Sequence, residues 1–202
     1  MNDESQNALL KSLEEPYPNS YIIMITNRPK CLLNTIYSRC QVINIPPLKI
    51  SDLNEWLINN GVSDVNATDF PSFISPLKIL MDLENNQHQN FKEFIKIISD
   101  FISSTSDTNI TIKNIISLDI DLIMKINYLI EFLKIILKSR LLSEELSGVY
   151  KVFNKSTFNN LKISNLMNEL NSLRYDYFKV PQINETHVLN YYLSELKNSI
   201  KI

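Results

Sequence analysis

Glycine is scarce: the 202-residue chain contains only Gly61 and Gly148. Tight hairpin turns draw heavily on glycine, so the shortage argues against a fold rich in β-sheet and favours a mostly helical chain. Loops of the form GxxxxGK[ST], which cradle phosphate groups, need clustered glycines. With two glycines this far apart, no such loop is possible within this sequence.

Cysteine and histidine are equally rare, with two of each. Cys31 and Cys40 are nine positions apart, a spacing that fits no zinc motif. His88 and His187 are far apart in polar surroundings, which predicts two surface side chains. We therefore expect no metal site and no catalysis by this chain alone. The low cysteine content suits a reducing compartment, and we expect a cytoplasmic protein.

The chain also lacks a strong charge bias and a long uncharged apolar run. Its net charge is -2, so no global basic field is available to hold nucleic acid, and any DNA contact must be local or made within a larger assembly. The most apolar region, 120–137, contains Asp121, Lys125, Glu131 and Lys134. These charges argue against a membrane span, and the polar N-terminus does not resemble a signal peptide.

What the sequence does contain is apolar residues at helical spacing, especially from about residue 87 onward. Residues 119–146 carry two apolar stripes instead of one, which predicts the central helix of a bundle. Another helix is predicted within 156–178. The last helix is predicted to start at Asn184, a favourable N-cap, and to bury Leu189, Leu193 and Leu196.

Two shorter helices are predicted between residues 47 and 84. The first has Ser51 as its N-cap and ends at Asn60-Gly61, which favours a left-handed stop. Its inward side chains are predicted to be Leu53, Trp56 and Leu57. The second covers about 75–84, with an apolar set of Leu77, Leu80, Met81 and Leu83.

The N-terminal part alternates between helix and strand patterns. "ESQNALLKSLEE" (4–15) predicts a helix ended by Pro16, and "YIIMIT" (21–26) predicts a strand buried on both faces. A short helix beginning near Pro29 precedes "QVINI" (41–45), which alternates as a second strand. Because a buried strand needs neighbours, we expect the natural domain to begin upstream and this chain to be a fragment.

Arg39 stands between Ser38 and Cys40, at the junction of the short helix and the second predicted strand. A guanidinium is planar and always charged, so it suits phosphate oxygens, including those of a nucleotide on a neighbouring chain. From spacing alone, an exposed or salt-bridged surface arginine is the commoner interpretation. Glu14 and Glu15 end the first helix, where the macrodipole disfavours carboxylates, and a solvated pair is the simpler interpretation.

Three segments together resemble the AAA+ clamp-loader subunits of bacterial DNA polymerase III. They are "NALLKSLEEP" (7–16), "YIIMITNRPKCLLNTIYSRCQ" (21–41) and "PPL" (46–48). The proline pair is similar to the delta-prime type. "INETHVLNYYLSEL" (183–196) is similar to the last collar helix of that type.

A further segment also favours the delta-prime type. In "SPLKILMDL" (75–83), an ungapped comparison puts Leu77, followed by Lys78, where the family's ATPases carry a sensor arginine. The departure suits a subunit that does not hydrolyse ATP.

The resemblance implies a mainly α fold in three parts. Residues 1–46 would be the C-terminal part of an AAA+ α/β module, and 47–84 a small helical lid domain. Residues 85–202 would form a helical-bundle collar domain that mediates oligomerisation.

The resemblance also implies a role for Arg39, as an arginine finger supplied in trans to the ATP site of a neighbouring subunit. Thr26 and Asn27 match a nucleotide-sensor position. No cofactor is expected on this chain, because ATP and Mg would sit on the neighbour. The motifs that support the assignment also contain Ser38, Cys40, Asn7, Glu14 and Glu15.

In the family, this type of subunit holds a pentamer together through its collar while the complex loads the sliding clamp onto primed DNA. The implied partners are the gamma/tau and delta subunits, with the sliding clamp and primer-template DNA reached through the complex. The family's holoenzyme is a DNA-directed DNA polymerase. Two alternatives remain: a gamma/tau-type ATPase without its nucleotide loop, and an unrelated helical interaction module. The upstream sequence and co-purification would separate them.

Overall fold

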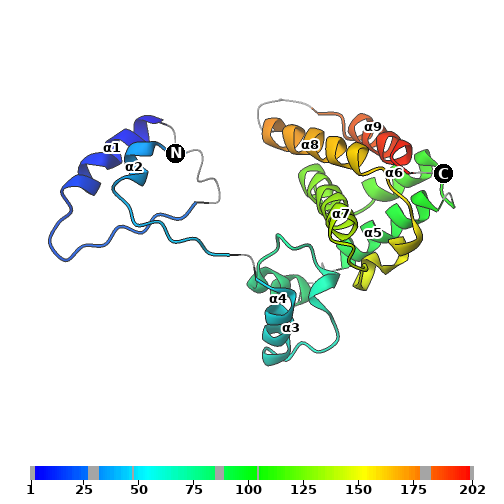
Figure 1. Cartoon of the computed structure of the whole chain (residues 1–202), viewed down its shortest axis with the longest axis horizontal. Helices are drawn as coiled ribbons and strands as arrows, with labels where there is room; N and C mark the ends of the chain where they lie inside the picture. The colour runs from blue at the N-terminus through cyan, green and yellow to red at the C-terminus, as the bar shows by residue number, and fades with distance from the viewer. Residues whose placement is uncertain are drawn as a thin grey trace. The chain divides into compact units, whose positions relative to one another are not determined.

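The computed structural model of the chain divides into two compact units, Met1–Pro47 and Leu48–Ile202 (Figure 1). Regular structure in the described part is helical, and its only β pairing is an isolated bridge between Phe158 and Ile200. The mainly α prediction is therefore confirmed. The structure describes residues 3–26, 32–46, 48–84, 89–103, 105–177 and 183–200.

The N-terminal unit contains two helices that pack on each other. Helix α1 spans Asp3–Glu14, as its apolar spacing predicts, and α2 spans only Asn34–Tyr37. The main-chain N–H of Leu33 donates to Oε1 of the buried Gln6 at 2.9 Å, and Ile36 is fully buried beside this contact. One partly buried hydrogen bond thus fixes the start of α2 against α1. Pro29, the predicted start of the second helix, lies outside the described residues.

The strands predicted at 21–26 and 41–45 do not form, and the prediction that 21–26 is buried is wrong. Both segments have no regular structure, and most of their large apolar side chains face solvent; Ile25 is 94% exposed and Ile45 88%. A strand is stabilised by ladder hydrogen bonds and side-chain pairs with a neighbour. Within the described residues neither segment has such a neighbour, so the apolar pattern alone does not produce a strand.

Residues 48–84 form a small helical part with its own core of Leu57, Phe70 and Ile79. Helix α3 begins two residues earlier than predicted, so Lys49 and not Ser51 occupies the N-cap position. Gly61 takes the predicted left-handed conformation, with φ 80°, directly after the C-cap. The elements of this part are α3 (Ile50–Asn59), the 3-10 turn η2 (Ala67–Asp69) and α4 (Pro76–Glu84).

Helix α4 exposes two members of its predicted apolar set, Leu77 and Met81. Its buried edge instead carries Ile79 and Asp82, with Leu80 and Leu83 packed partly against the core. Apolar residues occupy most sides of this nine-residue helix, so its spacing alone does not specify which side faces inward.

The remaining helices build a bundle around α7, as its two apolar stripes predict. Ile126, Phe132 and Leu133 of α7 are buried, and α7 lies against α8 and α5 (Figure 1). No helix in the described ranges combines the length and apolar character needed to cross a bilayer. The bundle elements are α5 (Gln89–Ile102), α6 (Thr108–Ile116), α7 (Leu122–Leu142), η3 (Gly148–Lys155), α8 (Asn160–Asp176) and α9 (Glu185–Asn198).

Helix α9 forms as predicted. Oδ1 of Asn184 accepts from the main-chain N–H of His187 at 3.1 Å, which satisfies one of the free donors of the first turn. His187 itself is exposed, in agreement with its predicted surface position. The predicted inward side chains are buried: Leu189, Leu193 and Leu196.

A partly buried ion pair, formed by a buried lysine, joins bundle helices. Lys125 of α7 is only 3% exposed, and its Nζ donates to Oε1 of Glu185 in α9 at 2.8 Å and to the carbonyl of Ile116 in α6 at 3.3 Å. A buried ammonium is tolerated only when its donors are used. The charge that interrupts the apolar stripe of α7 therefore has a structural role inside the bundle.

Tyr128 of α7 makes stability sensitive to alkaline pH. Burial, and secondarily the Asp82 carboxylate, raise the pKa of Tyr128 to about 12, whereas tyrosine in an unfolded chain titrates near pH 10. Its contribution is fully present below about pH 10 and is lost as the pH rises toward about 12. We expect the free energy of unfolding to fall by up to about 1.4 kcal/mol per pH unit in this window.

Urea unfolding at about pH 8 and about pH 11 measures this loss. The Tyr128→Phe variant should show a shallower pH dependence, whereas a mutation-independent slope would contradict the assignment. Part of the slope should remain in that variant, because burial also raises the pKa of Tyr192 to about 12.

Candidate functional site

Arg39 lies just beyond α2, and its guanidinium is held by three contacts. Nη2 donates to Oε1 of Glu14 at 2.5 Å, and Nη1 donates to the carbonyl of Thr35 at 2.9 Å and to Oγ of Ser38 at 3.2 Å. The side chains of Arg39 and Glu14 remain 34% and 49% exposed. The arginine is thus oriented by its own unit and still accessible to a partner.

The ion pair joins two segments that are 25 residues apart in the sequence. Glu14 is the last residue of α1, and the Gln6–Leu33 hydrogen bond keeps the start of α2 beside this helix. The interpretation of Glu14 as a merely solvated carboxylate misses this contact. Opposite charges at the ends of two adjacent helices were the available signal, but the sequence does not show that these ends meet.

The Arg39–Glu14 pair is weak enough to be exchanged. A solvent-exposed ion pair contributes about 0–1 kcal/mol, because both partners stay hydrated and lose side-chain freedom. A phosphate group can accept hydrogen bonds from the same two guanidinium nitrogens, and it carries more negative charge than a carboxylate group. The contacts of Arg39 therefore orient its guanidinium and still allow it to exchange Glu14 for another anionic partner.

The other predicted motif residues surround this arginine in sequence and differ in exposure. Oγ of Ser38 donates to the carbonyl of Thr35 at 3.0 Å, and Cys40 is a half-buried free thiol. Asn7, Glu15 and Thr26 are exposed. Their functional roles stay predictions. Like Pro29, the residues Asn27, Cys31 and His88 lie outside the described residues.

Leu77 occupies the position compared with a sensor arginine, and the cation next to it, Lys78, already forms an ion pair within α4. Nζ of Lys78 pairs with Oδ1 of Asp82 at 2.7 Å, one turn further along α4, and Leu77 is exposed. No group of three or more histidine, cysteine, aspartate or glutamate side chains able to hold a metal ion occurs in the part of the chain that the structure describes.

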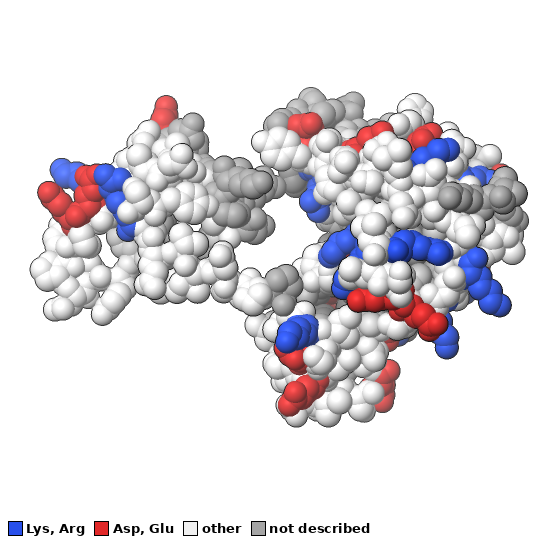
Figure 2. All heavy atoms as spheres, viewed as in Figure 1, with Lys and Arg blue, Asp and Glu red and all other residues white. Residues whose placement is uncertain are grey.

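Figure 2 shows the charged side chains on one face of the Leu48–Ile202 unit. Basic and acidic side chains are scattered there over a largely uncharged surface. Proteins that grip nucleic acid by themselves usually gather cations along one face. The visible face of this unit lacks such a continuous basic area.

One comparison matches the region that contains Arg39, and three others match partial stretches of the chain. The family model described as "DNA polymerase III, delta subunit" matches residues 1–49. Three proteins named DNA polymerase III subunit delta' are similar to the chain. The protein from Haemophilus influenzae is 46% identical over 57 residues, and the one from Pseudomonas aeruginosa is 44% identical over 57 residues. The protein from Bacillus subtilis is 41% identical over 86 residues.

These matches cover only parts of each protein. They include 28% of this chain and 17% of the Haemophilus and Pseudomonas relatives, and 43% of this chain and 26% of the Bacillus relative. Both halves of the arginine site, Glu14 and Arg39, lie within the region that the family model matches. Over these partial stretches, the chain is similar to proteins named DNA polymerase III subunit delta'.

Proposed function

We propose that this chain acts within a DNA polymerase III clamp loader as a subunit that does not hydrolyse ATP. In this proposal it supplies Arg39 in trans to the ATP site of a neighbouring ATPase subunit. The observation that carries the proposal is the accessible guanidinium of Arg39, oriented by Glu14 and by the carbonyl of Thr35. The delta-prime relatives supply the replication context.

The chemistry requires little from this chain except a positioned positive charge. During ATP hydrolysis, charge spreads over the oxygens of the transferred γ-phosphoryl group and over the leaving group. A guanidinium that reaches these oxygens stabilises the transition state more than the bound ATP, and it therefore raises the rate. ATP and Mg belong to the neighbouring subunit, and Arg39 would enter that site from outside.

The bundle, predicted as the collar of residues 85–202, would hold the chain in the complex. Its interior is closed by a continuous apolar core, and it also presents large apolar side chains on its surface. In this proposal the gamma/tau and delta subunits cover part of that surface, while the clamp and primer-template DNA are reached through the assembled complex. The exposed side chains in question are Ile110, Leu141, Leu142, Val152 and Leu161.

Reconstitution tests this function. Clamp loader is assembled from the ATPase and delta subunits, with or without the protein that contains this chain, and DNA-stimulated ATP hydrolysis and clamp loading are measured. We expect a stable complex and full activity only when the protein is present. Failure to co-purify with these subunits would favour an unrelated helical interaction module. Hydrolysis by the isolated protein would favour the gamma/tau-type ATPase.

A further inference from the structure

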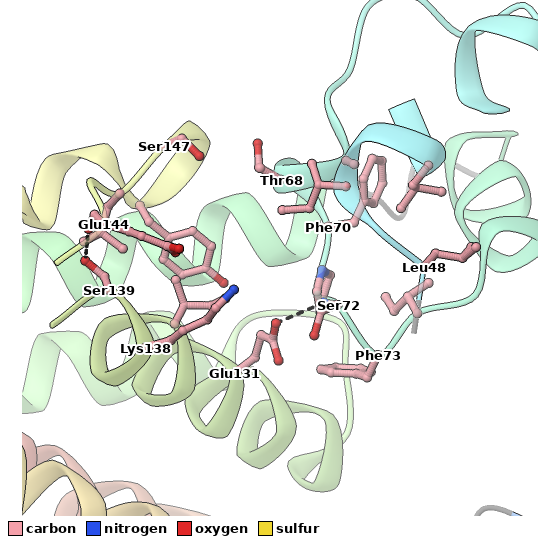
Figure 3. A pocket seen from close by; sticks show the side chains of 18 of the residues that line it. Leu48, Thr68, Phe70, Ser72, Phe73, Glu131, Lys138, Ser139, Glu144 and Ser147 are labelled. Carbon is pink, nitrogen blue, oxygen red and sulfur yellow. Dashed lines mark hydrogen bonds between the residues drawn. The ribbon is translucent and has the colours of Figure 1, made fainter. Parts of the chain in front are cut away.

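The Leu48–Ile202 unit contains a cavity of about 360 Å³ between the small helical part and the bundle (Figure 3). One wall is the segment that follows η2, and the opposite wall is formed by α7 and the start of η3. Most of the lining is apolar, and the volume falls in the range of roughly 300–1,000 Å³ typical of small-molecule sites. Its principal apolar side chains are Phe70, Phe73, Ile74, Ile135 and Leu146.

One carboxylate at this cavity is fully engaged within the protein. Oε1 of the buried Glu131 accepts from the main-chain N–H of Ser72 at 3.1 Å, and Oε2 accepts from Nζ of Lys134 at 3.2 Å. Figure 3 shows Glu131 and Ser72 facing each other across the two walls. Because both oxygens have partners, Glu131 holds the walls together and is not free to bind a ligand.

The hydroxyl of Tyr150 differs from Glu131 in this respect. Tyr150 lines the same cavity and is 5% exposed, and its hydroxyl has no hydrogen-bond partner in the described structure. A buried hydroxyl without a partner costs stability. Burial, together with the charge of Glu131, raises the pKa of Tyr150 well above its usual range, so the hydroxyl keeps its proton. It is therefore a hydrogen-bond donor that lacks an acceptor.

The charges around the cavity restrict which ligands can offer the Tyr150 hydroxyl a hydrogen-bond acceptor. Among the described lining residues, Glu144 and Glu145 face one lining cation, Lys138, while Glu131 is already paired with Lys134. An anion entering a largely apolar cavity would be desolvated and repelled by these carboxylates. A neutral oxygen, such as a ketone, ester or amide carbonyl, accepts a hydrogen bond without this cost.

We propose that the cavity binds a small uncharged molecule with an apolar body and one carbonyl oxygen, which accepts a hydrogen bond from the Tyr150 hydroxyl. The apolar side chains hold the body, and Tyr150 sets the orientation. A ligand there touches both the small helical part and the bundle. Binding therefore stabilises the contact between them by mass action. This site is separate from Arg39 and does not depend on the proposed clamp-loader function.

Three probes of nearly equal shape test the proposal. Acetophenone carries a carbonyl, α-methylstyrene replaces that carbonyl by a methylene, and benzoate replaces the methyl ketone by a charged carboxylate. Titrations of the full chain are followed by NMR of the protein. We expect acetophenone to bind about five- to tenfold more tightly than α-methylstyrene, as one net hydrogen bond allows, and benzoate to bind more weakly than either.

The Tyr150→Phe variant tests whether the Tyr150 hydroxyl causes the tighter binding of acetophenone. It removes only the unpartnered hydroxyl, so it should fold and bind both neutral probes with the affinity that the wild type has for α-methylstyrene. Tyr191→Phe is the matched control, because Tyr191 is an exposed tyrosine of α9 that is hydrogen-bonded to Glu169. The control should keep the wild-type preference. Equal binding of the neutral probes to the wild type, a preference that survives Tyr150→Phe, tightest binding of benzoate, or no binding at all would each overturn the proposal.

Discussion

The Gly148→Ala variant is expected to lose about 2–5 kcal/mol of folding free energy. Gly148 has φ 57°, a left-handed conformation that costs a residue with a Cβ about 1–2 kcal/mol. An added Cβ would also overlap Oγ1 of Thr68 and lie 2.8 Å from its Cβ. Relieving such an overlap typically costs a further 1–3 kcal/mol or so. Since Thr68 belongs to η2, the strain falls on the contact between the small helical part and the bundle.

Gly61→Ala is the matched control for this variant. Gly61 also has a positive φ, 80°, but a Cβ added there meets no atom within 4 Å. We expect only the conformational cost, about 1–2 kcal/mol. Urea unfolding monitored by circular dichroism compares the two. Equal losses at both positions would show that the contact with Thr68 is not tight.

The second large effect is expected at the neighbour's ATP site. In reconstituted clamp loader whose other ATP sites are disabled, Arg39→Ala should lower the DNA-stimulated hydrolysis rate at that site by about 10²–10³, the usual loss when one preorganised transition-state contact is removed. Arg39→Lys should recover only part of the rate, because a lysine keeps the charge but not the planar fork. Assembly should be unaffected, since the exposed Arg39–Glu14 pair contributes at most about 1 kcal/mol.

Glu14→Gln separates a direct role of Arg39 from a structural one. This variant keeps the arginine and removes its carboxylate partner. If Arg39 acts on the neighbour's phosphate, the rate of ATP hydrolysis there should change by only a few-fold. The guanidinium is less well oriented without Glu14, but it no longer has to leave a carboxylate partner. A loss as large as that of Arg39→Ala would mean that the ion pair, and not the free end of the arginine, matters for activity.

The helices that could be predicted from sequence are those whose signals are local. The Asn184 cap needs only main-chain donors in the next turn, and the two stripes of α7 fix burial on a wide arc wherever its neighbours lie. The end of α3 at Gly61 depends on the positive φ of that residue, which glycine adopts readily. Each of these features follows from residues within one or two turns, which is why the sequence alone specifies them.

Features that depend on distant partners could not be predicted in this way. The segments 21–26 and 41–45 have the composition of strands, but strand formation requires a neighbouring edge. The site shows the same limit: Arg39 was recognised from its motif, while its ion pair with Glu14 depends on how α1 and α2 pack. Tyr150 carries no signal at all in the sequence, because only the packed structure leaves its hydroxyl without a partner.

The most direct test of the central claim is the affinity of the assembled complex for a transition-state analogue. ADP with aluminium fluoride mimics the charge distribution of phosphoryl transfer, and a non-hydrolysable ATP analogue represents the ground state. With Arg39→Ala, binding of the transition-state analogue at the neighbour's site should weaken by at least about tenfold, while binding of the ATP analogue should stay within about threefold. Unchanged affinity for both analogues, or equal weakening of both, would contradict a role for Arg39 in the neighbour's transition state.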